Sequence, residues 1–88
     1  TCIVHLIRHS LGYVPWKERA AMAALLRPVY TAPTVEAAEA ALQALEDSPL
    51  GRRYATVAPA WRRAWPHVVP FFAFPPEVRR MVYTTNAI

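Results

Sequence analysis

The chain has 88 residues, 55% of them hydrophobic, and its net charge is +4 because ten Lys and Arg outnumber six Asp and Glu. A chain of this length forms one small domain or part of a larger one, and it buries only about 60–65% of the surface that its unfolded form exposes. A single cysteine excludes an internal disulfide and is typical of a reducing compartment. We expect no membrane span because no apolar run approaches about 18 residues, and no signal peptide because the apolar start is short and contains His5 and Arg8.

The basic charge and the high aromatic content both suggest contacts with other molecules. The positive charge fits contact with nucleic acid or another polyanion, and it fits equally well a solvated surface that is basic without a partner. Three Trp, three Phe and four Tyr are a large apolar surface for 88 residues to bury. We therefore expect part of it to pack against protein outside this chain.

Three helices are predicted in the first half of the chain. Apolar residues recur at helical spacing over residues 2–14, until a proline interrupts the pattern. Alanine and leucine favour a second helix over 16–27, which a loop with two prolines follows at 27–34. A third helix covers 35–47, with Thr34 as its N-cap and one apolar stripe along its length.

The second half is divided by prolines. A fourth helix is predicted over 52–66, which Pro59 should kink or restart. The apolar stretch HVVPFFAFPP predicts a short helical turn and then a loop, and a last short helix covers 76–82 before an extended or turn segment at 84–88. No segment alternates as a strand would. The sequence therefore predicts an all-α chain of four to five short helices.

Cys2 and His5 form a C-x-x-H pair on one face of the first predicted helix. Half of a zinc site has this spacing, and His9, four residues later, is a candidate third ligand, but tetrahedral zinc requires further ligands. The alternative is a packed cysteine beside a hydrogen-bonding histidine.

No complete catalytic set is present in the residues themselves. Four of the six acidic residues lie on one predicted helix, as its solvated surface: Glu36, Glu39, Glu46 and Asp47. Gly12 and Gly51 are the only glycines, which excludes a glycine-rich phosphate loop, and neither Ser10 nor Ser48 has a nearby base and carboxylate.

The segment WRRAW places Trp61 and Trp65 on one helix face with arginines beside them. Aromatic side chains interleaved with arginine suit stacking on bases and pairing with phosphates. The basic members of this candidate DNA-binding cluster are Arg52, Arg53, Arg62 and Arg63, and His67 follows them. The alternative is two core tryptophans with arginines on the solvent side. Arg79 and Arg80 are predicted near a helix C-terminus, where cations are favoured.

Four segments in order resemble the Mutator-type transposases of bacterial insertion sequences: CIVHLIRHSLGYV, WKERAAMAALLRPVYTAPTVEAAEAAL, WRRAW and FFAFPPEVRRMVYTTNAI. The resemblance covers essentially the whole chain, and its most specific parts are CIVH, FPPEVRR and YTTNAI. It implies a ribonuclease-H-like α/β transposase core in which Asp, Asp and Glu hold two divalent metal ions, Mg or Mn, that promote in-line displacement at phosphorus.

The resemblance also implies where this chain lies in the parent protein. In the family, the Cys-x-x-His motif, here Cys2 and His5, follows the second catalytic Asp, and the catalytic Glu follows the segment TTNAI. The chain is then a fragment between these acids: residues 1–15 begin a core helix, 16–74 form a helical insertion, and 75–88 return to the active site. None of the three carboxylates falls on a residue of this sequence, and Thr85 and Asn86 would be neighbours of the metals rather than ligands.

Function follows from the same resemblance as a set of expectations. The parent enzyme would bind insertion-sequence ends and target DNA, cleave and transfer DNA strands, work as a homo-oligomer, and reside at the nucleoid in the bacterial cytoplasm. The fragment alone would be inactive, and by analogy Trp61 or Trp65 would stack on a base at the element end. The alternative is a small free-standing helical module that binds DNA or a protein partner.

Overall fold

A computed structural model describes residues 3–85 of the chain, with the side chain of Thr85 excepted. These residues form six α-helices and two 3-10 helices and no strand, which confirms the all-α prediction for the part that is described. In chain order the elements are α1 Ile3–Gly12, η1 Trp16–Glu18, α2 Arg19–Tyr30, α3 Val35–Asp47, α4 Pro49–Arg53, α5 Val57–Val68, η2 Val69–Ala73 and α6 Pro76–Thr85. None of these helices is long and apolar enough to cross a membrane.

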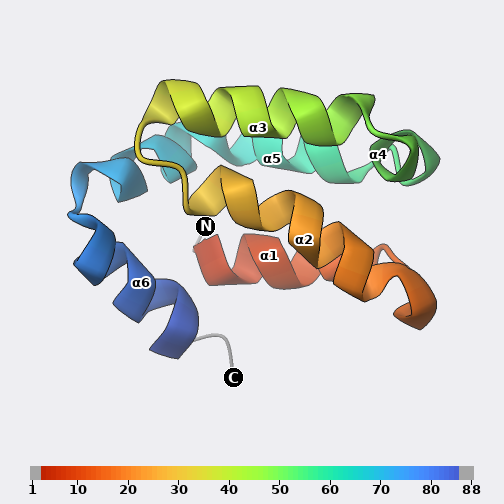
Figure 1. Ribbon diagram of the computed structural model, residues 1–88, viewed down its shortest axis with the longest axis horizontal. Coiled ribbons are helices and arrows are strands. Elements are labelled where there is room, and N and C mark those ends of the chain that lie inside the picture. The colour runs from red at the N-terminus through yellow and green to blue at the C-terminus, as the bar shows by residue number, and fades with distance from the viewer. Residues whose placement is uncertain (1–2, 86–88) are drawn as a thin grey trace.

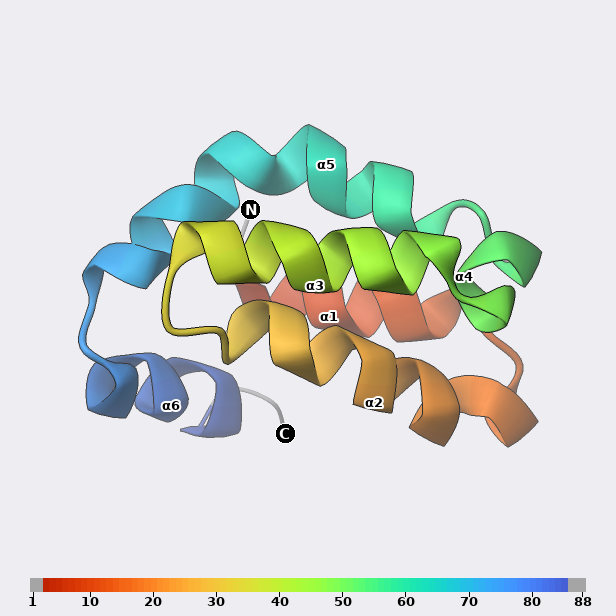
Figure 2. The ribbon, with the colours of Figure 1, turned by 45° about the horizontal axis from the view of Figure 1, so that its top comes forward.

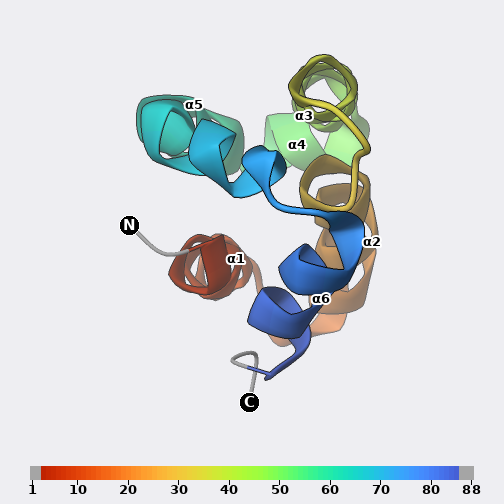
Figure 3. The ribbon, with the colours of Figure 1, turned by 90° about the vertical axis from the view of Figure 1, so that its left-hand side faces the viewer.

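Four helices form the body of the fold. Along the long axis, α1, α2, α3 and α5 occupy the corners of a bundle, while α6 lies across one end of it (Figures 1 and 3). The short α4 lies at the other end and joins α3 to α5 (Figure 2). The largest completely enclosed side chains line the space between these helices: Trp61, Met22, Leu26, Leu42 and Leu45.

Helix α3 forms where local signals agree. The Thr34 hydroxyl accepts a hydrogen bond of 3.1 Å from the amide of Ala37, which satisfies one of the unpaired amides of the first turn. The predicted apolar stripe is buried. Ser48 ends α3 and caps α4, because its hydroxyl oxygen accepts from the amide of Gly51 at 3.0 Å. The predicted bounds 35–47 are therefore those of the structure.

Two of the predicted helices differ from the structure because of where the prolines and polar caps lie. Helix α2 continues through the exposed Pro28 to Tyr30, and both the amide and the hydroxyl of Thr31 donate to the carbonyl oxygen of Arg27 at its end. The predicted helix at 52–66 is two helices. Pro59 is the third residue of α5, where a helix amide has no intrahelical partner, so the proline needs no kink.

The last helix is longer than predicted. Helix α6 extends to Thr85, so Thr84 and Thr85 are helical, and Arg79 and Arg80 lie in the middle of the helix rather than near its C-terminus. Residues 86–88 lie outside the described part. The apolar core draws on all three predicted regions 1–15, 16–74 and 75–88, and the boundaries between these regions stay predictions.

Candidate nucleic-acid interface

Trp61, the first residue of the WRRAW segment, is a core residue. Its side chain is completely buried, and its indole N–H donates to the hydroxyl of Ser10 at 2.7 Å. That hydroxyl in turn donates to the carbonyl oxygen of Leu6 at 2.7 Å, so the chain of polar groups is satisfied. A base could stack on this ring only if α1 and α5 separated. In the described fold Trp61 is therefore a core residue, which was the alternative that the sequence left open, and Trp65 is the tryptophan considered further for the interface.

The two arginines of WRRAW lie on different sides of α5, because successive residues of a helix are rotated by about 100°. Arg62 is directed to α3, where its guanidinium donates to the carboxylate of Glu46 at 2.8 Å and to the amide oxygen of Gln43 at 3.0 Å. Both partners of this ion pair are solvent-exposed, so the pair contributes at most about 1 kcal/mol to stability. Arg62 can therefore exchange Glu46 for a phosphate at low cost.

Trp65 is the half-buried tryptophan on the α3 side of α5. Together with Glu39, Leu42 and Arg62 it lines a small pocket of about 130 Å³. An indole beside a guanidinium at a surface pocket is an arrangement in which an unpaired base can stack. Of the two tryptophans considered, only Trp65 has this access in the described fold.

Arg63 faces α1 instead. It borders a groove of about 360 Å³ between α1 and α5 whose other polar lining residues are His9, Tyr13 and His67. The floor of the groove is apolar. Sequence reasoning did not assign His9 and Tyr13 to a DNA surface. The available signal was spacing, since His9 and Tyr13, like Arg63 and His67, are four residues apart and share a helix face.

Arg52 and Arg53 lie on α4 and differ in their surroundings. Arg53 pairs with Glu18 of η1, and the hydroxyl of Tyr54 donates to the same carboxylate. The hydrogen bond to Glu18 raises the pKa of Tyr54, and partial desolvation adds to the rise. Arg53 thus links α4 to η1 at one end of the body (Figure 2). Arg52 is exposed and has no ion-pair partner among residues 3–85.

Arg79 is buried rather than part of a basic surface. Its guanidinium donates to the carbonyl oxygens of Ala32 at 2.7 Å and Phe74 at 3.1 Å, and it lies over the ring of Phe72 at 5.2 Å. The side chain is only 4% exposed. Arg79 therefore fastens α6 to the α2–α3 connection and to η2.

The remaining predicted residues gain no role from the structure. Cys2 and Asn86 lie outside the described residues, and nothing is described of the Thr85 side chain. His5 is exposed on α1. Within residues 3–85, no three His, Cys, Asp or Glu side chains gather as metal ligands would. The zinc and neighbour predictions for these residues stay predictions.

The acidic side chains do not fit a site for catalytic divalent metal. The Glu18 carboxylate is held by Arg53 and Tyr54, and Glu46 is paired with Arg62. The remaining acids of α3 lie along its exposed face. Two-metal sites require carboxylates that converge on one point, and these described carboxylates do not converge in this way.

The described residues define an all-α helical segment, and sequence comparison supplies its family. The sequence matches the family described as "Transposase, Mutator family" over residues 1–88. The chain belongs to the Mutator family of transposases.

Curated relatives are similar over the whole chain. It is 56% identical over 88 residues to the "Transposase for insertion sequence element ISRM3" of Rhizobium meliloti (strain 1021), of which it covers 22%. It is 52% identical over 88 residues to a "Probable transposase for insertion sequence element" of Corynebacterium diphtheriae, of which it covers 26%. No solved structure matches the chain. The chain thus spans 22–26% of the length of these two relatives.

Proposed function

We propose that this chain is a segment of a DNA transposase which, in its intact form, binds the ends of its insertion sequence and cleaves and transfers DNA strands. The observation that carries the proposal is the family match over residues 1–88, together with relatives named as insertion-sequence transposases at 52–56% identity. In the intact protein, a divalent metal, Mg or Mn, would stabilise charge at the attacked phosphate. Its ligands would come from outside this segment.

The segment itself would contribute DNA contacts. Arg63 and Arg52 are exposed arginines with no ion-pair partner among the described residues, and Arg62 is held by a weak surface pair. Guanidinium groups of this kind form bidentate contacts with phosphates. Trp65 adds a ring on which a base can stack. The homo-oligomer and the location at the bacterial nucleoid belong to the same proposal.

The test uses the intact transposase that contains this chain and a labelled duplex carrying the element end. We expect strand cleavage in the presence of Mg²⁺ or Mn²⁺ and none from the 88-residue chain alone. Trp65→Ala in the intact protein should reduce cleavage at least about fivefold, since a stacked base contributes about 1–3 kcal/mol. Trp65→Phe, which keeps a ring, is the matched control. An intact protein that neither binds nor cleaves the element end would refute the proposal.

A second candidate function is a free-standing helical module that binds DNA or protein. The closed core around Trp61, with its satisfied hydrogen bond to Ser10, favours a unit that folds alone. Gel filtration and thermal unfolding of the 88-residue chain test this alternative. A cooperatively unfolding monomer with salt-dependent DNA affinity supports it, and an aggregating chain contradicts it.

A further inference from the structure

A second basic groove, of about 630 Å³, lies between α2 and α6, away from the WRRAW segment. Each wall of the groove carries an arginine and, one helical turn later, a threonine. One wall has Arg27 of α2 and Thr31, the C-cap of α2, and the other has Arg80 and Thr84 of α6. Pro76 and Tyr83 complete the lining. Among the described residues that line the groove none is acidic, so the charge that they contribute is positive.

Of the threonine and arginine side chains in the groove, only the arginine guanidiniums are free to donate hydrogen bonds to a ligand. The hydroxyl of Thr31 donates to the carbonyl oxygen of Arg27 at 2.7 Å, and that of Thr84 donates to the carbonyl oxygen of Arg80 at 2.5 Å. A hydroxyl has one proton to donate, so neither threonine can donate to a ligand without giving up this bond. Neither guanidinium has a hydrogen-bond or ion-pair partner among residues 3–85.

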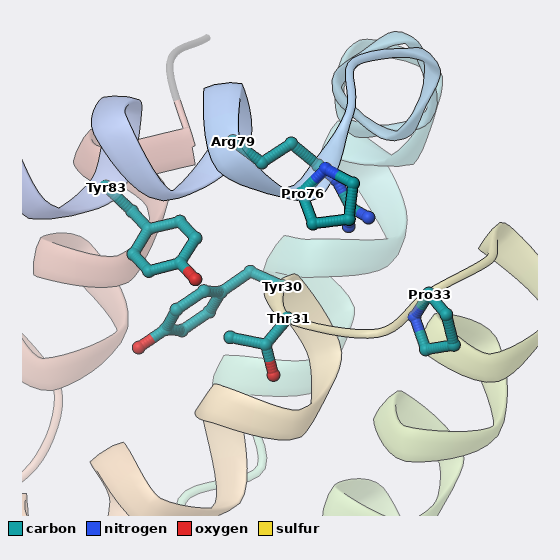
Figure 4. Close-up of a pocket in the computed structure, with 6 residues that line it drawn as sticks. All are labelled: Tyr30, Thr31, Pro33, Pro76, Arg79 and Tyr83. Atoms are coloured by element: carbon teal, nitrogen blue, oxygen red, sulfur yellow. The ribbon is translucent and has the colours of Figure 1, made fainter.

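The two walls are held together by contacts next to the groove (Figure 4). The rings of Tyr30 and Tyr83 meet edge to face with centroids 5.0 Å apart. Burial raises the pKa of Tyr30, while the charge of Arg27 opposes the rise. Arg79, on the helix turn beside Arg80, is anchored to the carbonyl oxygen of Ala32. A groove with fixed walls keeps two positive charges in place before a ligand arrives, which reduces the entropy lost on binding.

We propose that the α2–α6 groove binds the phosphodiester backbone of DNA, with Arg27 and Arg80 each contacting phosphate oxygens from opposite walls. Phosphate contacts from arginine fix the register of a strand without reading its sequence. The open, acid-free groove suits an extended polyanion. The inference rests on the proposed function in taking the anion to be DNA, and it adds a contact surface on the face of the fold that carries α6.

The test measures binding of a fluorescein-labelled 20-base-pair duplex to the 88-residue chain by anisotropy at 50, 100 and 200 mM salt. Arg27→Gln and Arg80→Gln should each weaken binding about fivefold and reduce the slope of log K against log salt by about 0.9. Arg27→Lys and Arg80→Lys keep the charge and should retain most of the affinity. Circular dichroism checks that each variant is folded.

The matched control is Lys17→Gln, which removes one exposed charge near the opposite end of α2. It should change affinity less than twofold. The inference is overturned if both arginine variants bind within twofold of the unchanged chain, if Lys17→Gln weakens binding equally, if poly-glutamate competes as well as DNA, or if the chain binds no duplex. Cleavage by the intact protein is a separate measurement, so the groove can fail while the proposed function stands.

Discussion

The hydrogen bond between Trp61 and Ser10 gives the sharpest prediction about the fold. Ser10→Ala removes the only described acceptor of the indole N–H, which is completely buried between α1 and α5. Leaving a buried donor unpaired costs about 1–3 kcal/mol. The higher helix propensity of alanine returns about 0.5 kcal/mol. The expected net loss in the free energy of unfolding is therefore about 0.5–2.5 kcal/mol.

Thermal unfolding of the 88-residue chain, followed by circular dichroism, measures this loss. For a domain of this size about 1 kcal/mol lowers Tm by roughly 4–8 °C, so Tm should fall by at least about 2 °C. Thr31→Ala is the matched control, because the Thr31 hydroxyl also bonds a carbonyl of its own helix but is exposed. It should change stability by less than about 0.5 kcal/mol.

A double-mutant cycle separates the hydrogen bond from local packing. Trp61→Phe removes the indole donor, so Ser10→Ala in that background should cost at least about 1 kcal/mol less than in the unchanged chain. If Ser10→Ala is neutral, or costs the same with Trp61 and with Phe at that position, the reasoning about a satisfied buried donor is refuted.

Three further predictions concern other parts of the fold. Gly51→Ala should destabilise the chain by at least about 2 kcal/mol in urea unfolding, because its new Cβ would lie 1.8 Å from the carbonyl oxygen of Leu45; an unchanged midpoint would contradict this close approach. Arg79→Met should cost at least about 2 kcal/mol, because two buried carbonyls lose a charged donor, and hydrogen exchange should then accelerate in α6 before the rest of the fold. The raised pKa of Tyr54 means that the folded chain holds this proton more tightly than the unfolded chain. The contribution of Tyr54 to stability is therefore complete below pH about 10 and is lost as the pH rises through the raised pKa. Tyr54→Phe should flatten the alkaline part of the plot of unfolding free energy against pH. An identical plot for the variant and the unchanged chain would contradict the link to Glu18.

Local signals predicted the ends of a helix correctly where several of them agreed, and less accurately where a single proline was the main signal. Helix α3 has a cap, an apolar stripe and a stop signal, and its bounds were predicted correctly. Pro59 was predicted to kink or restart the helix at 52–66, and the structure has the restart, because α5 begins two residues before the proline, at Val57. Its place in the first turn of α5 depends on where α4 ends, which is a tertiary matter.

The candidate site was predicted in part. The sequence placed Arg62 and Arg63 correctly on one helix. It could not show that Arg62 contacts α3 while Arg63 faces α1, since this depends on how the three helices pack. The burial of Trp61 and Arg79 likewise depends on partners 51 and 47 residues away along the chain, Ser10 and Ala32. Composition marks such residues as polar or amphipathic, and only the packed fold decides which become interior.

The anchoring of Arg79 has a mechanical consequence. The end of the helix at Thr85, six residues beyond Arg79, lies about 9 Å further along the helix axis, and the edge-to-face contact between Tyr30 and Tyr83 holds this part of α6 to α2. Because α6 is fastened at both places, a tilt of roughly 10° about Arg79, which would displace that end by about 1.5 Å, also requires the two tyrosine rings to shift against each other. Substitutions at residues 31–34 that move the carbonyl of Ala32 should therefore act on both anchors of α6 and not on Arg79 alone.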